Sequence, residues 1–290
     1  MFHTADALLA TLDPLPHHHR LRRLALSVPD LAERGALTGV LDDLDRRGDH
    51  ERRLAALAAL VGRQEHFLTA RLADPDPVVA GYALRGARAL PLPDAAIEAA
   101  YEDASAATRD RIARFLWAGD RPHLTERLVT RLRDQGDDTE AARLLPGCSA
   151  SFTAAALPGL AHAVTSPVRL ARRHPGPFLD QAERDLAERT RGAGQADWWQ
   201  RHGGALAVVT ATHPERVLTL LERHGPGTLP YCLRRCAGAL VAADAERFVR
   251  RLLPPERDHP RHEPDLPSGV FRALVRAGPA DPRPLVALTG

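Results

Sequence analysis

The sequence contains no lysine and no asparagine, so its 39 basic residues other than histidine are all arginines. The absence of lysine excludes a phosphate-loop lysine, a Schiff-base lysine and a lysine general base. Isoleucine is also scarce and occurs only as Ile97 and Ile112. Because the codons of these three residues are rich in A and T, we interpret their scarcity as the coding bias of a high-GC bacterial genome. The abundance of arginine is therefore weak support for phosphate binding.

Long apolar runs and a balanced set of cysteines are missing as well. No segment approaches the roughly 20 apolar residues of a membrane span, so we expect no membrane partner. The three cysteines, Cys148, Cys232 and Cys236, are an odd number in a long chain and do not indicate a disulfide framework. The N-terminus lacks the basic start and the apolar core of a signal peptide, and we expect a cytoplasmic protein.

The chain has enough apolar residues to fold, since they make up 44% of 290 residues, but aromatic residues make up only 4%. The net charge is +2. Residues 1–150 contain 20 arginines against 23 acidic residues, and residues 151–290 contain 19 against 14. This mild asymmetry is far from the basic stripe of a dedicated nucleic-acid-binding protein.

Apolar residues recur at the spacing of amphipathic helices, as in Leu54, Leu57, Ala58 and Val61. Strand signals are poor, because the only notable β-branched run is 208–210 within an alanine-rich stretch. Leucine and alanine, which favour helix, supply most of the apolar content. The sequence therefore predicts an all-α fold.

Turn residues separate the helical segments at short intervals. Helix starts are indicated where Pro77 follows Asp76, where Pro93 precedes Asp94, and where Ser105 precedes an amphipathic segment. We expect helices over 4–12, 15–27, 35–46, 49–62, 64–74, 77–90, 93–103, 105–118, 122–134, 137–145, 151–162, 177–188, 195–212, 214–224, 229–242, 244–253 and 267–277.

Helix pairs recur along the chain at intervals of about 30 residues. Three units cover 64–90, 93–118 and 122–148, each with an acidic turn between its helices, and a degenerate fourth covers 214–242. One helix pair cannot bury its apolar stripe alone, whereas stacked pairs bury a continuous core. The repetition therefore predicts an α-solenoid of antiparallel helix pairs.

One of these turns resembles a known repeat family. The stretch 72–80, LADPDPVVA, followed by Ala83, Leu84 and Arg85, resembles the turn and second helix of HEAT repeats. In that family an Asp-Pro pair precedes a helix that begins with a Val-Arg-x-x-Ala pattern. This chain departs from the pattern at Val79, which stands where the family has arginine.

The resemblance covers 49–148 and extends more weakly to 214–277. It implies a right-handed superhelix with a concave face that binds proteins and sometimes nucleic acid. We expect an N-terminal helical cap over 1–48, HEAT-like repeats over 49–162, an irregular segment of helix and loop over 163–200 and further degenerate helical repeats over 201–290. The apolar end 285–290 suggests that the chain continues there or packs on a partner.

Three groups of residues have the chemistry of metal ligands but not the arrangement. The histidines 17–19 are consecutive and point about 100° apart on a helix, so they cannot bind one ion together. Cys232 and Cys236 share a helix face but lack the second pair that zinc requires. The stretch 258–263, DHPRHE, lies in a proline-rich loop and lacks the helical His-Glu-x-x-His spacing. We predict no metal site, no cofactor and no catalytic residue.

The three tryptophans each lie close to an aspartate. Trp117 precedes Asp120, and Trp198 and Trp199 follow Asp197. HEAT-like DNA glycosylases of the alkylation-repair type use tryptophans whose rings pack against the deoxyribose of the lesion, and an aspartate that stabilises developing positive charge. The likeness is one of composition and fold alone, and core packing of these indoles is the competing interpretation.

A last group is basic. Arg247, Arg250 and Arg251 would form one face of a helix, with Glu246 beside them. We predict a non-catalytic scaffold that binds a protein or peptide on a concave surface. The alternative is a nucleic-acid-binding solenoid, such as an alkylation-repair-type DNA glycosylase. The candidate partner-binding residues are Trp117, Asp120, Trp198, Trp199, Arg247, Arg250 and Arg251.

Overall fold

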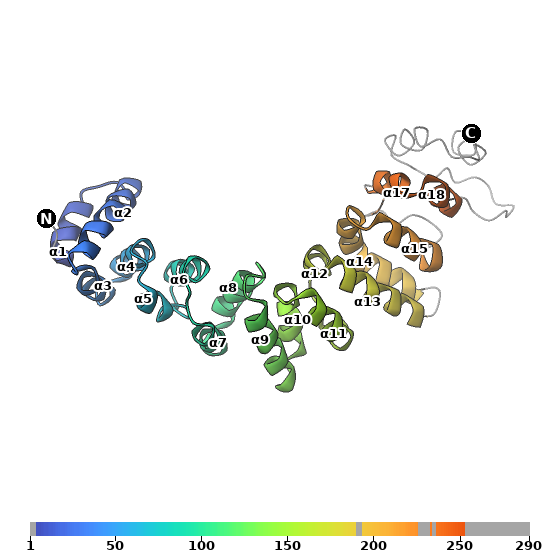
Figure 1. Cartoon of the computed structure of the whole chain (residues 1–290), viewed down its shortest axis with the longest axis horizontal. Coiled ribbons are helices and arrows are strands. Elements are labelled where there is room, and N and C mark those ends of the chain that lie inside the picture. The colour runs from blue at the N-terminus through green and yellow to red at the C-terminus, as the bar shows by residue number, and fades with distance from the viewer. Residues whose placement is uncertain (1–3, 190–192, 226–232, 234–235, 253–290) are drawn as a thin grey trace. The chain divides into compact units, whose positions relative to one another are not determined.

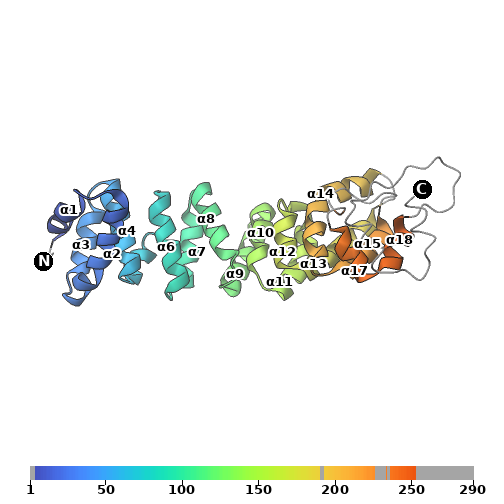
Figure 2. The same cartoon turned by 90° about the horizontal axis from the view of Figure 1, so that it is seen from above.

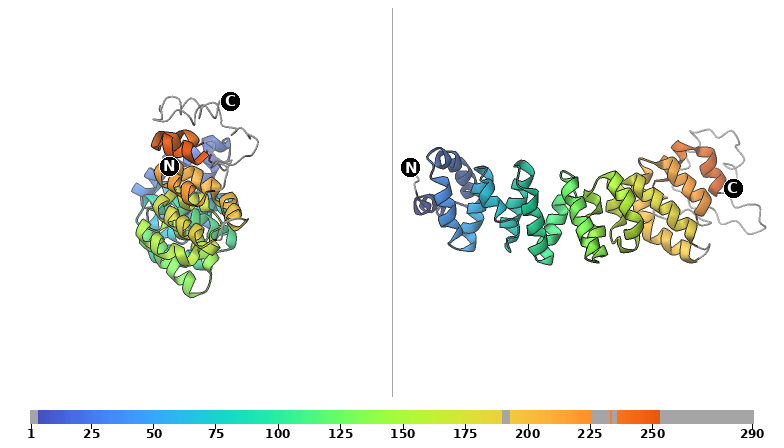
Figure 3. Two further views of the ribbon diagram at one scale, coloured as in Figure 1. Left: turned by 90° about the vertical axis from the view of Figure 1, so that its right-hand side faces the viewer. Right: turned by 60° about the horizontal axis from the view of Figure 1, so that its bottom comes forward.

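The computed structural model describes residues 4–189, 193–225, 233 and 236–252. The chain divides into two compact units, unit 1 (Met1–Leu124) and unit 2 (Thr125–Gly290), and each is considered by itself below. All secondary-structure elements within the described residues are helices (Figure 1, Figure 2 and Figure 3). The predicted all-α class is therefore confirmed.

Unit 1 begins with eight helices of 5 to 17 residues. They are α1 (Ala5–Leu12), α2 (His17–Glu33), α3 (Leu37–Asp45), α4 (Asp49–Val61), α5 (Glu65–Thr69), α6 (Pro77–Ala89), α7 (Asp94–Asp103) and α8 (Ala106–Leu116). The division between the units falls within α9 (Pro122–Asp134).

The helices of unit 1 lie in two layers. α2, α4, α6 and α8 pack in succession and form what we call the even layer. On the other side, α3, α5 and α7 form the odd layer, and each packs against the even helix that follows it (Figure 1).

Neighbouring helices of the even layer run parallel. The Arg20 guanidinium lies 2.8 Å from His50 Nε2, which joins the N-terminal ends of α2 and α4. At the other end of the layer, the Arg88 guanidinium lies over the ring of Phe115 and joins the C-terminal halves of α6 and α8. Each odd helix thus returns the chain between two parallel even helices.

Side-chain caps start these helices where the sequence predicts them. Asp76 accepts a hydrogen bond from Val78 N at 2.8 Å, and Ser105 accepts one from Thr108 N at 3.3 Å. Each cap satisfies an N–H that the first helical turn leaves without a partner. The predictions for α6 and α8 are confirmed at these positions.

The core of unit 1 consists mainly of leucine and alanine. Small residues let its helices approach closely, and Gly86 is the clearest example. A Cβ at this position would lie 2.7 Å from Leu68 Cδ1, so a side chain there would force the buried Leu68 side chain to move.

α2 is longer than the sequence suggests. The prediction ends near residue 27, ahead of Pro29, but the helix continues to Glu33. Pro29 removes one backbone hydrogen bond, yet it lies on the exposed side of the helix. Burial of Leu24, Val28 and Leu31 on the opposite side holds the helix together across the proline.

Unit 2 continues from α9 with eight α-helices among its described residues. They are α10 (Asp138–Leu144), α11 (Ala150–Leu160), α12 (Pro167–Arg173), α13 (Pro175–Glu188), α14 (Ala193–Thr210), α15 (Pro214–His224), α17 (Ala237–Ala243) and α18 (Ala245–Leu252). α11, α13 and α15 pack in succession, and α12 packs against α14.

The segment 163–200, expected to combine irregular helix and loop, contains α12, α13 and the beginning of α14. The prolines that interrupt the helical pattern lie in first helical turns: Pro167 begins α12, and Pro175 begins α13. A proline costs little there because its missing N–H would have had no partner within the helix. α12 is a helix that the sequence pattern did not predict.

Several predictions fall outside the described residues. These are the helix over 267–277, the apolar end 285–290, and the loop 258–263. Within the part of the chain that is described, no helix is both long and apolar enough to cross a membrane.

Candidate functional site

Trp198 and Trp199 belong to the core of unit 2. Their exposed fractions are 2% and 3%, and their rings meet edge to face with centroids 5.6 Å apart. Trp198 Nε1 donates to Asp185 Oδ2, and Trp199 Nε1 donates to the His224 carbonyl, both at 3.1 Å. Neither indole presents a ring face to a partner in this structure, so the sequence-based placement of these two residues at a binding surface has no support here.

His202 completes this cluster from the next turn of α14. Its ring stacks on Trp198 with centroids 4.4 Å apart and an interplanar angle of 16°. Burial disfavours the charged imidazole and lowers the pKa of His202. The cluster is thus a packed arrangement of three rings, one of which donates to the Asp185 carboxylate.

Trp117 and Asp120 lie at the end of α8 in unit 1. Trp117 is the C-cap residue and is half-buried, whereas Asp120 is exposed. The positive φ of 76° at Gly119 turns the chain between them. This pair remains at the surface of its unit, unlike the tryptophans of unit 2.

Arg247 is held by a carboxylate of its own unit. Its Nε and Nη2 donate to the two carboxylate oxygens of Glu222 at 3.0 and 2.6 Å, and Nη2 also donates to Thr219. The hydrogen bonds to Glu222 are the main reason that its pKa is raised. The side chains of Arg250 and Arg251, the other members of the predicted basic face, lie outside the described residues.

The other candidate residues from the sequence offer little for binding or catalysis. The histidines 17–19 are exposed at the start of α2. Cys236 is half-buried, with its Sγ 3.4 Å from the Ala207 carbonyl, and Cys232 lies outside the described residues. Burial raises the pKa of the Cys148 thiol, which keeps it protonated in the core.

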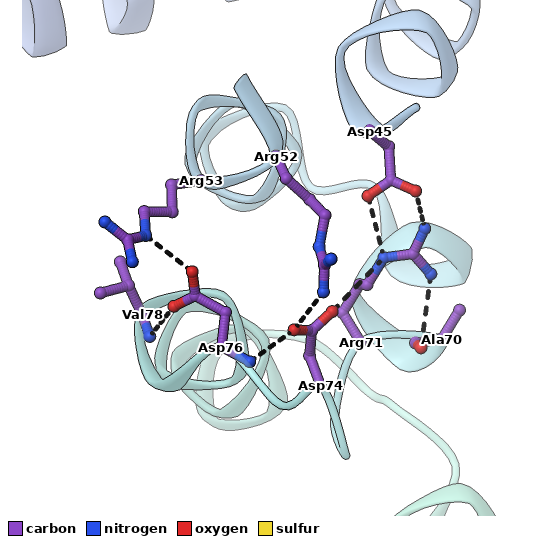
Figure 4. A network of polar contacts seen from close by, with 8 residues as sticks. All are labelled: Asp45, Arg52, Arg53, Ala70, Arg71, Asp74, Asp76 and Val78. Atoms are coloured by element: carbon purple, nitrogen blue, oxygen red, sulfur yellow. Dashed lines mark hydrogen bonds and ion pairs between the residues drawn. The ribbon is translucent and has the colours of Figure 1, made fainter. Parts of the chain in front are cut away.

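A polar network in unit 1 joins α3 and α4 to the turn before α6 (Figure 4). Arg52 Nη2 donates to Asp74 Oδ1 at 2.6 Å, and the same oxygen accepts from Asp76 N at 2.8 Å. Arg71 is paired with Asp45, and its Nε lies 4.0 Å from Asp74 Oδ2.

The network continues at the start of α6. Arg53 Nε donates to Asp76 Oδ2 at 2.7 Å. Burial opposes ionisation of Asp76, but the hydrogen bonds from Arg53 and from Val78 N prevail and lower its pKa.

Four residues of this network, Asp45, Arg52, Arg71 and Asp74, line a shallow surface depression of about 350 Å³. In the network as a whole, three arginines are paired with three aspartates. We infer that the network fixes the turn between α5 and α6 and joins it to the preceding helices. It leaves no charged group for a ligand.

The charges of unit 1 are divided unequally between its two layers. The odd-layer helices α3, α5 and α7 contain no arginine, and α7 alone carries Asp94, Glu98, Glu102 and Asp103. In the even layer, α6 carries two arginines and no acidic residue. α8 carries three arginines and one aspartate.

The arginines of α6 and α8 follow one repeated pattern. Arg-x-Ala-Arg occurs at 85–88 and at 111–114, with the two middle residues buried in both cases. Residues i and i+3 lie on the same side of a helix, so each pattern directs two guanidinium groups to one face. The pattern occurs once more, at 169–172 on α12 in unit 2.

Three of these four arginines make no ion pair with any described residue: Arg85, Arg88 and Arg111. The Arg85 guanidinium lies over the Tyr82 ring, with a distance of 5.5 Å to the centroid, and Arg88 lies 5.6 Å from the Phe115 centroid. Arg114 is paired with Asp110. We call Tyr82, Arg85, Arg88 and Arg111 the arginine face.

Comparison with known proteins adds no relative to this description. Neither protein-family models, nor curated proteins, nor solved structures give a match to this chain.

The arginine face was not predicted from the sequence, although a signal for it exists. The recurrence of Arg-x-Ala-Arg at 85–88 and 111–114 is visible in the sequence, and both occurrences fall in the predicted repeats. What the sequence does not show is that α6 and α8 are neighbours in one layer and that acidic side chains are concentrated in the other.

Proposed function

We propose that this chain is a non-catalytic interaction module that binds a protein or peptide partner. In this proposal unit 1 is part of a right-handed, HEAT-like α-solenoid. The parallel packing of α2, α4, α6 and α8, with each odd helix returning the chain between them, supports such a repeat arrangement.

The observation that carries the proposal is the unequal charge of the two layers. A solvated repeat needs charge for solubility, but it does not need to keep all its helical arginines in one layer, as α2, α4, α6 and α8 do here. This unequal distribution creates a local field on one face, which steers a partner of opposite charge and fixes its orientation. The even layer is therefore the surface that we assign to the partner.

Photo-crosslinking from the two layers would test this proposal. A photoreactive phenylalanine analogue at Tyr82 samples the even layer, and the same analogue at the exposed Ala99 on α7 samples the odd layer. We expect one protein to be cross-linked from Tyr82 and not from Ala99, and to bind the unmodified chain again after purification. Equal labelling from both positions, or none from Tyr82, would contradict the proposal.

The glycosylase alternative gains no support from the described tryptophans of unit 2. Packing against a deoxyribose requires an accessible ring face, and Trp198 and Trp199 are both buried. The surface pair Trp117 and Asp120 is what remains of that alternative. A nucleic-acid ligand is accordingly one of the outcomes that the experiments below distinguish.

A further inference from the structure

We propose that the arginine face binds an acidic peptide segment of the partner through the carboxylates of its side chains. This inference rests on the proposed function, because it specifies the chemistry of the partner that the even layer would bind. The bound segment would be an extended peptide that crosses α6 and α8.

The position of the arginines within their helices supports a role other than helix stability. Arginine in the last turn of a helix stabilises the helix dipole, and Arg88 and Arg114 lie in such turns. Arg85 and Arg111 lie one turn earlier, where that benefit is small. A second function accounts better for the unpaired charge at these two positions.

The contrast with Arg109 shows what a structural arginine does in the same helix. Arg109 donates from Nε to the Tyr101 carbonyl at 3.2 Å and from Nη2 to the Glu102 carbonyl at 3.1 Å. It thereby satisfies carbonyls at the end of α7. Arg85, Arg88 and Arg111 have no comparable partner among the described residues.

The arginine face has the dimensions of a peptide site. Neighbouring packed helices lie about 8–10 Å apart. The contact of Arg88 with Phe115 places Arg85 and Arg111 in the same part of the two helices. Residues i and i+2 of an extended peptide lie about 7 Å apart on one side, so alternate carboxylates can reach arginines of both helices.

The aromatic contacts prepare the face for binding. Tyr82 and Phe115 each lie beneath a guanidinium group, which limits the orientations that the arginine samples before it binds. A guanidinium group offers two parallel donors that match a carboxylate. Half-buried Tyr82 also provides apolar surface for the stems of glutamate side chains.

Charge favours a peptide over a nucleic-acid duplex. Proteins that bind duplex DNA commonly neutralise about 6–10 phosphates. The arginine face provides three unpaired arginines, and the whole chain has a net charge of only +2. A short acidic segment matches this number of cations, whereas a duplex needs more of them along its length.

The test is a fluorescence anisotropy titration of the full chain against a labelled oligoglutamate peptide, with an oligoglutamine peptide and a short DNA duplex as comparison ligands. We expect saturable binding of oligoglutamate at low salt that weakens as salt is added. Combined R85A, R88A and R111A should weaken this binding at least about tenfold, because several charge-assisted hydrogen bonds are lost together.

The matched control removes charge from the same layer at a different place. Arg22 and Arg23 on α2 are exposed and make no ion pair with described residues, and α4 separates them from the arginine face. R22A/R23A should change oligoglutamate binding by less than about twofold. Circular dichroism melting curves should show that every variant is folded.

A second variant covers the case in which the triple variant does not fold. R85E changes one exposed side chain and should by itself weaken binding, whereas R85K should retain part of it. The inference is overturned by any of three results: no saturable binding of oligoglutamate, an equal loss in R22A/R23A, or tighter binding of the duplex through the same arginines.

These results remain distinguishable from failure of the proposed function. A protein cross-linked from Tyr82, together with no binding of oligoglutamate, would overturn the acidic-peptide inference alone. Absence of any cross-linked protein at Tyr82 would contradict the proposed function, whatever the peptide does.

Discussion

The turn 74–76 of unit 1 and the aromatic cluster 198–202 of unit 2 stabilise helix packing by different means. At the turn, Asp74 and Asp76 accept hydrogen bonds from Arg52 and Arg53 of a neighbouring helix. At the cluster, Trp198 and Trp199 fill the core, and their N–H groups donate to neighbouring elements.

This difference shows two ways in which short helices can be packed in a defined arrangement. The core of unit 1 consists mainly of leucine and alanine, whose similar side chains define the helix packing only loosely. Directional hydrogen bonds at its turns therefore define how the helices meet. The large rings of unit 2 define the packing by shape, and its ion pairs between Arg216 and Asp180 and between Arg223 and Glu183 stay exposed.

The largest effect is expected for Trp199→Ala in unit 2. Removal of this buried ring should lower the free energy of unfolding by about 3–5 kcal/mol, as for other tryptophan truncations in cores. Denaturant unfolding followed by circular dichroism measures the change. Trp199→Phe keeps a ring but leaves the His224 carbonyl without its donor, and should cost about 1–2 kcal/mol. A cost below 1 kcal/mol for Trp199→Ala would show that unit 2 is not held by this cluster.

A smaller effect is expected for Asp74→Ala in unit 1. The Asp74 side chain is 5% exposed, and its loss leaves Arg52 and Asp76 N without their acceptor. Because Arg52 is 27% exposed and can turn toward water, we expect the free energy of unfolding to fall by about 2 kcal/mol. Breaking a fully buried ion pair would lower it by more.

The control for this variant is Asp43→Ala, which removes a more exposed carboxylate of the same unit. Asp43 pairs with Arg47 one helical turn away, and its side chain is 38% exposed. We expect less than about 0.5 kcal/mol from it. If Asp43→Ala and Asp74→Ala lowered the free energy of unfolding equally, the turn 74–76 would not be the contact that defines the packing of unit 1.

The two units should also respond to acid in different pH ranges. The pKa of His202 is lowered in the fold, so below its ordinary value of about 6.5 protons bind preferentially to the unfolded chain. Unit 2 should therefore begin to lose stability as the pH falls below about 6.5. The pKa of Asp76 is lowered as well, so its contribution to unit 1 is lost only below about pH 4.

Hydrogen exchange measured on peptides from each unit, at a series of pH values, would follow these losses separately. His202→Phe keeps a ring on Trp198 without a titrating group and should reduce the response of unit 2 between pH 6.5 and 5. Asp76→Asn should reduce the response of unit 1 to stronger acid. If unit 1 lost protection first, the assignment of these pH ranges to the two groups would be wrong.

The smallest effect is expected for Arg216→Ala, which removes an exposed ion pair of unit 2. Arg216 and Asp180 have side chains that are 41% and 56% exposed. Such pairs contribute about 0–1 kcal/mol, so the unfolding midpoint should barely move. A loss as large as that of Asp74→Ala would remove the contrast between this exposed pair and the pair of Arg52 with Asp74.

The sequence predicted much of the local structure and little of the site. α9 and α15 have the predicted bounds, because an amphipathic stripe and a starting proline are local signals. α12 was not predicted, because Pro167 and Pro175 are compatible with a loop as well as with first helical turns. The continuation of α2 past Pro29 depends on burial of the opposite side of the helix, which is a tertiary effect.

The candidate site shows the same limit more clearly. Tryptophans in an aromatic-poor sequence are reasonable candidates for binding, but only packing decides whether Trp198 is accessible or buried. The arginine face depends on α6 and α8 lying side by side, and a single sequence does not show this adjacency. The repeated Arg-x-Ala-Arg was the one local signal present.

The most direct test of the central claim is amide hydrogen exchange of the full chain with and without oligoglutamate. A ligand on the arginine face should slow amide exchange in α6 and α8. The exchange rates of the acidic helix α7 should not change, except at residues that contact α6 or α8. The same experiment on R85A/R88A/R111A should show no slowing. Protection centred on α3 or α7, or protection that persists in this variant, would contradict the account.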